Sequence, residues 1–235
     1  MRLLVTRPEP DATRLAGALQ ALGHEAIVAP LMTIEMRGRA PDLAGVQALV
    51  FTSANGVRAL VHHLGGRVPP LAALCVGEAT AAAARAAGFA RVIAAAGDVA
   101  ALAASVRGAC DPAAGALLHV AGSHRAGDLK GALEAAGFSV HRAVLYEAVA
   151  APRLPEPARA ALAAGEAAGV LLFSPRTARL YGRLADAAGL AAQARHIAAY
   201  CLSPAVAAAL DDGRDGAVHV APRPDLAALL GLLSS

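Results

Sequence analysis

The fold is decided by the stretch RLLVTRPEPDATRLAGALQALGHEAIVAPLMTIE, Arg2–Glu35, because the chain repeats it once. The second copy is ALLHVAGSHRAGDLKGALEAAGFSVHRAVLYEAV, Ala116–Val149. Each copy reads as a strand, a polar turn, a helix that ends in LGH or AGF, and another strand. A supersecondary unit of this kind must bury its apolar face against further modules. The repeat therefore predicts two similar domains.

A second module follows each copy and is also repeated. Ala48–Val57 (ALVFTSANGV) matches Gly169–Thr177 (GVLLFSPRT), and Leu74–Thr80 (LCVGEAT) corresponds to Cys201–Val206 (CLSPAV). Short apolar runs alternate with alanine-rich helical stretches, which is typical of α/β proteins, and evenly apolar strands favour parallel sheets covered on both faces. We expect strands at Leu3–Thr6, Ala26–Ala29, Leu49–Thr52, Leu74–Val76, Val92–Ala94, Leu117–Val120, Val140–Leu145, Val170–Phe173, Ile197–Cys201 and Val218–Val220.

The modules allow two arrangements. In one, residues 1–115 and 116–235 form two tandem domains. In the other, the first module joins the last module, and the two middle modules form an inserted domain. Two extended, Pro-terminated passages, Glu35–Pro41 and Glu147–Pro152, favour the inserted arrangement, in which they would run side by side as a short ladder. It gives a discontinuous domain of residues 1–35 and 152–235, an inserted domain of residues 41–145, and hinge linkers of residues 36–40 and 146–151.

Composition excludes several classes of protein. The 235 residues suffice for two domains with cores of useful size. Although 57% of the residues are hydrophobic, every stretch long enough to span a bilayer contains Arg, Asp or Glu, and the start lacks a signal-peptide pattern. Three scattered cysteines indicate neither disulfides nor zinc. A net charge of +3 and 3% aromatic residues give nucleic-acid binding little support. We expect a cytoplasmic enzyme without a metal.

Six strand ends run into turns built from small or helix-capping residues. Backbone N–H groups at helix starts attract anions, and in open α/β sheets such starts lie at the carboxyl ends of the strands. The alternative is that all of these turns are ordinary helix caps. The candidate anion-binding residues in them are Thr6, Arg7, Ser53, Asn55, Gly77, Thr80, Gly122, Ser123, Arg125, Ser174, Arg176 and Ser203.

Tyr146 is the candidate for acid–base chemistry. It lies where the second strand of the repeated module passes into the linker, facing whatever the two domains enclose, and a phenol there can donate a hydrogen bond to a departing hydroxyl. The alternative is a tyrosine that only packs the hinge. The chain contains no G-x-G-x-x-G, no G-x-x-x-x-G-K-[ST] and no G-x-S-x-G, which weakens the nucleotide-binding and hydrolase hypotheses.

The order and spacing of the motifs resemble the uroporphyrinogen-III synthase family over nearly the whole chain. The residues that carry the resemblance are LLVTRP at Leu3–Pro8, GHEAIVAPLMTIE at Gly23–Glu35, VFTSANGV at Val50–Val57, CVGEAT at Cys75–Thr80, LYEA at Leu145–Ala148 and LLFSPRT at Leu171–Thr177.

This resemblance implies an α/β fold of two similar flavodoxin-like domains, each a parallel sheet flanked by helices. A two-stranded hinge would join them, with the second domain inserted into the first and a cleft between the two. It also implies a lyase that needs no cofactor and cyclises hydroxymethylbilane, a linear tetrapyrrole with eight carboxylates, to uroporphyrinogen III. Water is lost and the last pyrrole ring, ring D, is inverted.

Tyr146 matches the family's linker tyrosine, while Thr80 and Ser174 match substrate-positioning hydroxyls. Ser203-Pro204-Ala205-Val206 departs from the family's Gly followed by a Thr pair, which puts a role for that threonine in doubt. We expect a monomer whose partner is the small-molecule substrate, with neither a nucleic acid nor a membrane involved.

One other class of protein remains open, and a further one is not supported. A non-enzymatic two-lobed binding protein or regulator would close on an anionic ligand through the same turns. A receiver-like phosphate acceptor would need an acidic cluster at the strand ends, which the sequence lacks.

Overall fold

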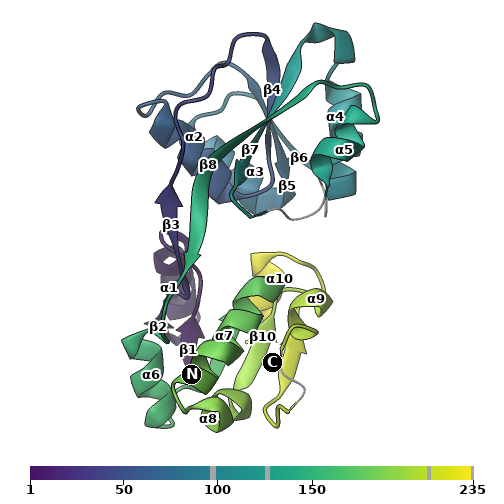
Figure 1. The fold of residues 1–235 in the computed structure, drawn as a ribbon. Helices are drawn as coiled ribbons and strands as arrows, with labels where there is room; N and C mark the ends of the chain where they lie inside the picture. The colour runs from purple at the N-terminus through teal and green to yellow at the C-terminus, as the bar shows by residue number, and fades with distance from the viewer. Residues whose placement is uncertain (96–98, 125–127, 211–212, 234–235) are drawn as a thin grey trace. The chain divides into compact units, whose positions relative to one another are not determined.

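The computed structural model describes residues 1–95, 99–124, 128–210 and 213–233. The chain forms two compact units (Figure 1). Unit 1 contains Met1–Thr33 and Val149–Ser235, and unit 2 contains Ile34–Ala148. The first and last parts of the chain therefore fold together, and the middle part is inserted between them.

Unit 1 is a five-stranded sheet in the order β11-β10-β9-β1-β2. All of its strand pairs are parallel. Its strands are β1 (Arg2–Val5), β2 (Glu25–Val28), β9 (Gly169–Leu172), β10 (Ala198–Cys201) and β11 (Val218–Val220). Its helices are α1 (Asp11–Ala21), α6 (Glu156–Ala163), α7 (Pro175–Ala187), α8 (Ala191–His196), α9 (Pro204–Ala207) and α10 (Leu226–Gly231).

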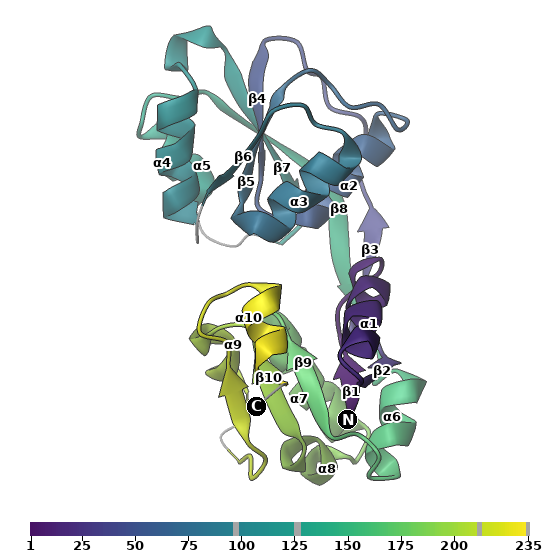
Figure 2. The ribbon, with the colours of Figure 1, turned by 180° about the vertical axis from the view of Figure 1, so that it is seen from behind.

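Helices cover both faces of the sheet in unit 1 (Figure 2). On one face, Leu15 and Leu19 of α1 and Leu229 of α10 pack with Leu3 and Leu171 of the central strands into one buried cluster. The amphipathic α7 lies on the other face, with Leu180 and Leu184 among its buried residues. Because both faces are covered, the strands are apolar at nearly every position, as the sequence predicted.

Unit 2 is a six-stranded sheet in the order β3-β8-β7-β4-β5-β6. Its strands are β3 (Met32–Met36), β4 (Val46–Phe51), β5 (Ala72–Val76), β6 (Val92–Ala95), β7 (Ala116–Gly122) and β8 (Val140–Ala150). Its helices are α2 (Ala54–His63), α3 (Gly77–Ala87), α4 (Val99–Ala109) and α5 (Leu129–Glu134), with a short 3₁₀ helix at Pro112–Ala114. Pairs among β4 to β8 are parallel.

Alternate residues along the central strands of unit 2 face two separate cores. Phe51 and Val120 pack against α2 and α3, whereas Val50 and Leu117 pack against α4 and α5. Figure 1 shows these two helix pairs on opposite faces of the sheet. Because helices cover both faces, a ligand can reach the sheet only at the ends of its strands. In a parallel sheet all the carboxyl ends of the strands lie on one side, which we call the carboxyl edge.

β3 and β8 are the two passages that connect the units, and they pair with each other. The Arg37 N–H donates to the Leu145 carbonyl and the Ala151 N–H to the Leu31 carbonyl, both at 2.9 Å, so the two segments run antiparallel. The sequence predicted extended linkers here but no strand at Met32–Met36, and it ended the last strand of the repeat at Leu145. The structure adds the strand β3 and extends β8 to Ala150, because the two segments pair with each other.

The internal repeat explains why one copy contains a continuous strand and the other a broken one. β1 and β2 pair with Leu3 opposite Ala26, and β7 and β8 pair with Leu117 opposite Val140, which is the same register in both copies. Pro30 in the first copy occupies the position of Val144 in the second. Proline cannot donate to a strand ladder, so the first copy divides into β2 and β3, whereas β8 continues without a break.

The predicted fold class is confirmed: two sheets flanked by helices and parallel except at the β3–β8 pair, the second unit inserted into the first, and a two-stranded connection. No helix among the described residues is long and apolar enough to cross a lipid bilayer.

Candidate functional site

The carboxyl edge of the sheet in unit 2 gathers several of the predicted residues, because β8, β7, β4 and β5 are consecutive neighbours. At the end of β4, Ser53 caps α2, and its Oγ accepts a hydrogen bond from the Asn55 N–H at 3.2 Å. The Asn55 Oδ1 accepts from Arg58 Nη1 at 2.7 Å. The serine accepts from one of the N–H groups at the start of α2 and is thus an ordinary helix cap. Any further role for these side chains stays a prediction.

The next turn, at the end of β5, opens α3 without a capping side chain. Gly77 is the first residue of this helix and has φ +70°, a conformation that glycine adopts at little cost. Val76 at the cap position offers no hydrogen-bond acceptor in its side chain. Thr80 lies one turn inside α3, with 5% of its surface exposed. A helix start without a side-chain cap keeps first-turn N–H groups available for a carboxylate.

The pair β7–β8 brings Gly122, Ser123 and Tyr146 together. The Ser123 N–H donates to the Tyr146 carbonyl at 3.0 Å. A Cβ placed on Gly122 would lie 2.9 Å from both Cε2 and Cζ of the tyrosine ring, so the ring lies directly against the glycine backbone. Tyr146 is half-buried and also packs against the core beside α2. Arg125, also expected here, lies outside the described residues.

Tyr146 therefore belongs to a paired strand rather than to a linker. Its phenol is held at the same sheet edge as the starts of α2 and α3, which are the neighbouring strand-to-helix turns. This arrangement can hold an anionic ligand at backbone N–H groups while presenting one hydroxyl that can donate a proton or a hydrogen bond.

In unit 1, the turn after β1 differs from what the sequence suggested. Thr6 is 1% exposed, and its hydroxyl donates to the Leu171 carbonyl of β9 at 2.8 Å. α1 begins only at Asp11, and the Glu9 carboxylate accepts from the N–H of Thr13 at 3.1 Å. The turn at Thr6-Arg7-Pro8 thus leads into α1 only after Pro8 and Pro10, and acidic side chains occupy the first turn of this helix.

Arg7 nevertheless lies at this edge. Its Nη2 is 3.0 Å from Asp11 Oδ2, and its guanidinium carbon is 4.5 Å from the centre of the Phe173 ring. An arginine held between a carboxylate and an aromatic face has a fixed direction, which favours recognition of a further carboxylate. The binding roles of Thr6 and Arg7 stay predictions.

The remaining turns of unit 1 follow β9 and β10. Ser174 caps α7: its Oγ accepts from the Thr177 N–H at 3.1 Å and lies 2.8 Å from the Thr177 hydroxyl. Arg176 is half-buried in the first turn of α7. Ser203 precedes α9 but makes no side-chain capping bond, and this helix has only four residues. The turns lie where the sequence placed them, while their contact with a ligand stays a prediction.

The surroundings of two cysteines and one histidine do not make these side chains more reactive. Burial raises the pKa of the Cys75 thiol to about 12 and that of Cys201 to about 11, so both remain protonated. Burial, together with the charge of Arg142, lowers the pKa of His119 to about 4. No group of three or more His, Cys, Asp or Glu that could hold a metal occurs within the part of the chain that the structure describes.

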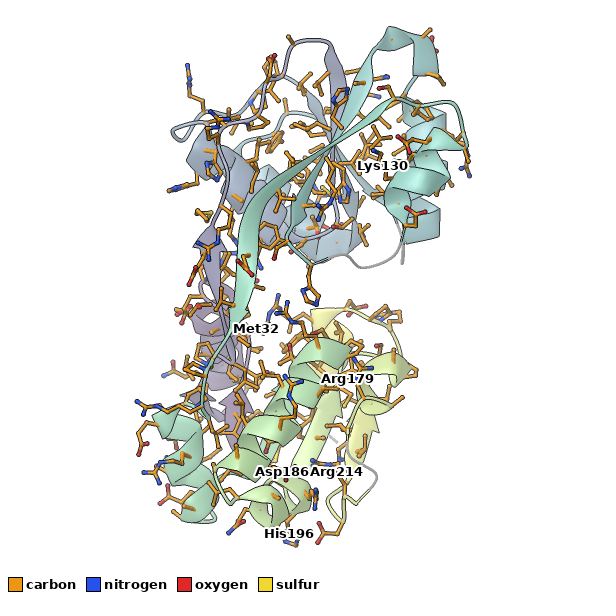
Figure 3. All side chains as sticks on the ribbon, viewed as in Figure 1. Met32, Lys130, Arg179, Asp186, His196 and Arg214 are labelled. Carbon is orange, nitrogen blue, oxygen red and sulfur yellow. The ribbon has the colours of Figure 1, made fainter. Side chains whose placement is uncertain are left out.

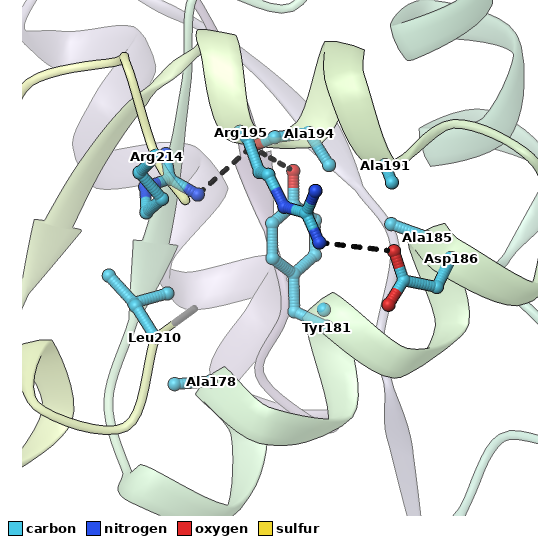
Figure 4. Close-up of a pocket in the computed structure, with 10 residues that line it drawn as sticks. Ala178, Tyr181, Ala185, Asp186, Ala191, Ala194, Arg195, Leu210 and Arg214 are labelled. Atoms are coloured by element: carbon cyan, nitrogen blue, oxygen red, sulfur yellow. Dashed lines mark hydrogen bonds and ion pairs between the residues drawn. The ribbon is translucent and has the colours of Figure 1, made fainter. Parts of the chain in front are cut away.

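A pocket between α7 and α8 in unit 1 is too small for a tetrapyrrole (Figure 4). Its volume of about 10 Å³ would hold roughly one water molecule. Inside it, Arg214 donates to the carbonyls of Ala194 and Ile197, which is a structural role. Figure 3 shows that Asp186 and Arg214 of this pocket lie farther along the direction of α7 than Arg179. These two residues therefore lie away from the start of α7 at Ser174.

The sequence missed one residue of the edge in unit 2. Arg142 of β8 donates from Nη2 to the Gly122 carbonyl at 2.5 Å. An arginine in a strand carries no local signal of its partner. Only the register of β8 against β7, with Arg142 opposite His119, brings it within reach.

These features define a class of protein: two α/β units of related topology, each with strand-to-helix turns at the carboxyl edge of its sheet, and one unit with a tyrosine at that edge. The family model of uroporphyrinogen-III synthase HemD matches residues 13–231. The chain belongs to this family, as its motifs predicted, and its function is that of a uroporphyrinogen-III synthase in tetrapyrrole biosynthesis.

Solved structures show the same fold. The uroporphyrinogen-III synthetase of Helicobacter pylori is 16% identical, with a TM-score of 0.64 over 99% of this chain and 97% of that one. A mutant uroporphyrinogen III synthase of the extremely thermophilic bacterium Thermus thermophilus is 19% identical, with a TM-score of 0.58 over 100% of this chain and 98% of that one. A search among curated protein sequences finds no match.

Proposed function

We propose that the protein is a cofactor-independent hydro-lyase that converts hydroxymethylbilane to uroporphyrinogen III. Family membership supports this reaction. The observation that supports the chemical step is the position of the Tyr146 phenol, which lies against Gly122 at the carboxyl edge of unit 2. We propose further that the enzyme acts in the cytoplasm, as a monomer, on a free small-molecule substrate.

Tyr146 assists the departure of the terminal hydroxyl. The carbon–oxygen bond breaks as a pyrrole nitrogen supplies electrons, and the phenol donates a hydrogen bond or its proton, so that water leaves and an azafulvene remains. Ring closure through a spiro intermediate then inverts ring D. The proton lost from the carbon that closes the macrocycle restores the balance. Overall, one water molecule is removed and no external acid is consumed.

The turns at the sheet edges hold the carboxylates of the substrate. In unit 2 the uncapped start of α3 at Gly77 offers N–H donors, and in unit 1 Arg7 and Arg176 offer guanidinium groups. Because the bilane also cyclises unaided to the wrong isomer, the protein contributes mainly by fixing one conformation. This explains why the described residues include so few groups with reactivity raised by their surroundings.

The test supplies the purified protein with freshly generated hydroxymethylbilane and separates the oxidised products by isomer. We expect isomer III to form faster than isomer I forms without protein. Formation of isomer I alone, at the rate seen without protein, would refute the proposal and would favour a non-enzymatic anion-binding protein of the same fold.

The role of Tyr146 is tested by Tyr146→Phe. Loss of one transition-state hydrogen bond should slow the formation of isomer III by roughly tenfold to a hundredfold. Tyr200→Phe is the matched control, because it removes the same hydroxyl from a buried tyrosine of unit 1. Equal, small effects of both substitutions would mean that Tyr146 only packs the strand.

A further inference from the structure

We propose that Arg142 is a positioning residue, which holds the backbone of Gly122 in the place where the ring of Tyr146 can lie against it. The inference rests on the proposed role of Tyr146 in the reaction. All three residues lie on adjacent strands of unit 2.

The first observation is a β-bulge at this point of the sheet. Ala121 pairs with Val144, but the next residue of β7, Gly122, pairs with Tyr146. β8 therefore contains one extra residue, Leu145, between the paired positions. A bulge changes the direction in which the following side chains point. As a result Leu145 and Tyr146, although adjacent in sequence, both pack against the same core beside α2.

The second observation is the contact that fixes the bulge from the side of β7. The Arg142 guanidinium donates to the Gly122 carbonyl at 2.5 Å, and the next N–H of the chain, that of Ser123, donates to the Tyr146 carbonyl at 3.0 Å. Gly122 is the last residue of β7, and a glycine at a strand end is free to take many backbone conformations. A charge-assisted hydrogen bond to its carbonyl selects one of them.

The third observation is the lack of space at Gly122. A Cβ there would be 2.9 Å from two ring carbons of Tyr146 and 3.2 Å from its hydroxyl. The position of the ring therefore depends on the exact position of the Gly122 backbone. A small rotation of that peptide would displace the phenol, and displacements on the order of 1 Å can reduce turnover by roughly a hundredfold.

Two other roles for Arg142 lead to different measurements. If Arg142 binds a substrate carboxylate directly, its loss raises KM and leaves kcat nearly unchanged. If Arg142 only stabilises the unit, its loss lowers the melting temperature and leaves the folded enzyme with normal turnover. A positioning role lowers kcat and changes the surroundings of the Tyr146 ring.

The chain offers a direct spectroscopic readout, since it contains three tyrosines and no tryptophan. Incorporation of 3-fluorotyrosine should give three ¹⁹F NMR signals, which Tyr→Phe substitutions assign. Tyr181 and Tyr200 are buried in unit 1 and serve as internal controls for folding. In Arg142→Gln we expect the Tyr146 signal alone to shift and broaden.

Turnover is measured on the unlabelled variants with freshly generated hydroxymethylbilane. Arg142→Gln should lower kcat for isomer III by roughly tenfold or more at nearly constant KM. Arg142→Lys keeps a positively charged donor and should restore part of this loss. Gly122→Ala should perturb the Tyr146 signal in the same way. Arg107→Gln, which changes an exposed arginine on α4 of the same unit, is the matched control and should leave both measurements unchanged.

An unchanged Tyr146 signal with unchanged kcat in Arg142→Gln would overturn the inference, as would a rise in KM alone. If Arg142→Gln fails to fold, the same criteria apply to Arg142→Lys. Failure of the proposed function is distinguishable, because a fully active Tyr146→Phe would remove the catalytic role of the tyrosine while the ¹⁹F signals still reported whether Arg142 positions its ring.

Discussion

Replacing His119 with glutamine should remove most of the acid sensitivity of unit 2. His119 lies in β7, opposite Val50 of β4 on one side and Arg142 of β8 on the other. Its Nε2 is buried and has no hydrogen-bond partner among the described residues. Burial first, and the positive charge of Arg142 second, lower the pKa of this histidine to about 4.

The magnitude follows from proton linkage. The unfolded chain binds a proton at His119 below about pH 6.5, whereas the folded protein does so only below about pH 4. Between these values the unfolded state holds more protons, so the free energy of unfolding falls as the pH is lowered. At about 1.4 kcal/mol per pH unit, the loss approaches roughly 3 kcal/mol by pH 4, and it is absent above pH 6.5.

The assay is urea unfolding at pH 7 and pH 4.5 for the wild type and His119→Gln, with ring NMR of the histidines to follow protonation. His141→Gln is the control, since His141 is the exposed neighbour in β8. We expect the difference in stability between the two pH values to shrink in His119→Gln and to stay as in the wild type in His141→Gln. An unchanged difference in both variants, or an NMR midpoint of His119 near 6.5, would refute the reasoning.

Three further predictions concern stability and are measured by denaturant unfolding. Ser174→Ala removes the capping acceptor of α7 and should cost about 1 kcal/mol, while Ser203→Ala, at a position without a capping bond, should cost only a few tenths; equal costs would contradict the assignment of the caps. Thr6→Val removes the buried hydrogen bond to β9 and should cost about 1 kcal/mol; a more stable variant would contradict it. Gly56→Ala places a Cβ 3.0 Å from the Val120 carbonyl and should destabilise unit 2, so an unchanged unfolding midpoint would show that α2 can move away.

Most of the fold could be predicted because its signals are local. Runs such as Leu49–Phe51 and Val170–Leu172 are apolar at every position, and they form central strands with both faces covered. β3 carried no such signal. Most of its residues are partly or fully exposed, and it forms a strand because it pairs with β8, about 110 residues away in sequence. A single sequence does not show a pairing at that distance.

The candidate site could be predicted only in part for the same reason. Ser53 and Ser174 are helix caps, and cap residues can be recognised in a sequence because they directly precede a helical pattern. Glu9 accepts a hydrogen bond from an N–H of the first turn of α1, and this contact depends on where the helix starts after two prolines. The contact of Arg142 with Gly122 depends on the register of two strands. Such contacts require coordinates.

The repeat itself shows why only one of its two copies has a tyrosine against the sheet edge. Superposed without a gap, Pro8 and Met32 of the first copy take the places of Gly122 and Tyr146 of the second. Met32 is buried and its copy has no phenol (Figure 3). Pro8 lies three residues beyond the end of β1 and has no N–H to offer, and Pro30 interrupts the strand two residues before Met32. The second copy has an unbroken strand, a bulge and a glycine, and these three features together make room for an aromatic ring at the sheet edge. The copy without the tyrosine thus supplies an internal comparison, which shows the sequence changes that accompany the Gly122–Tyr146 contact.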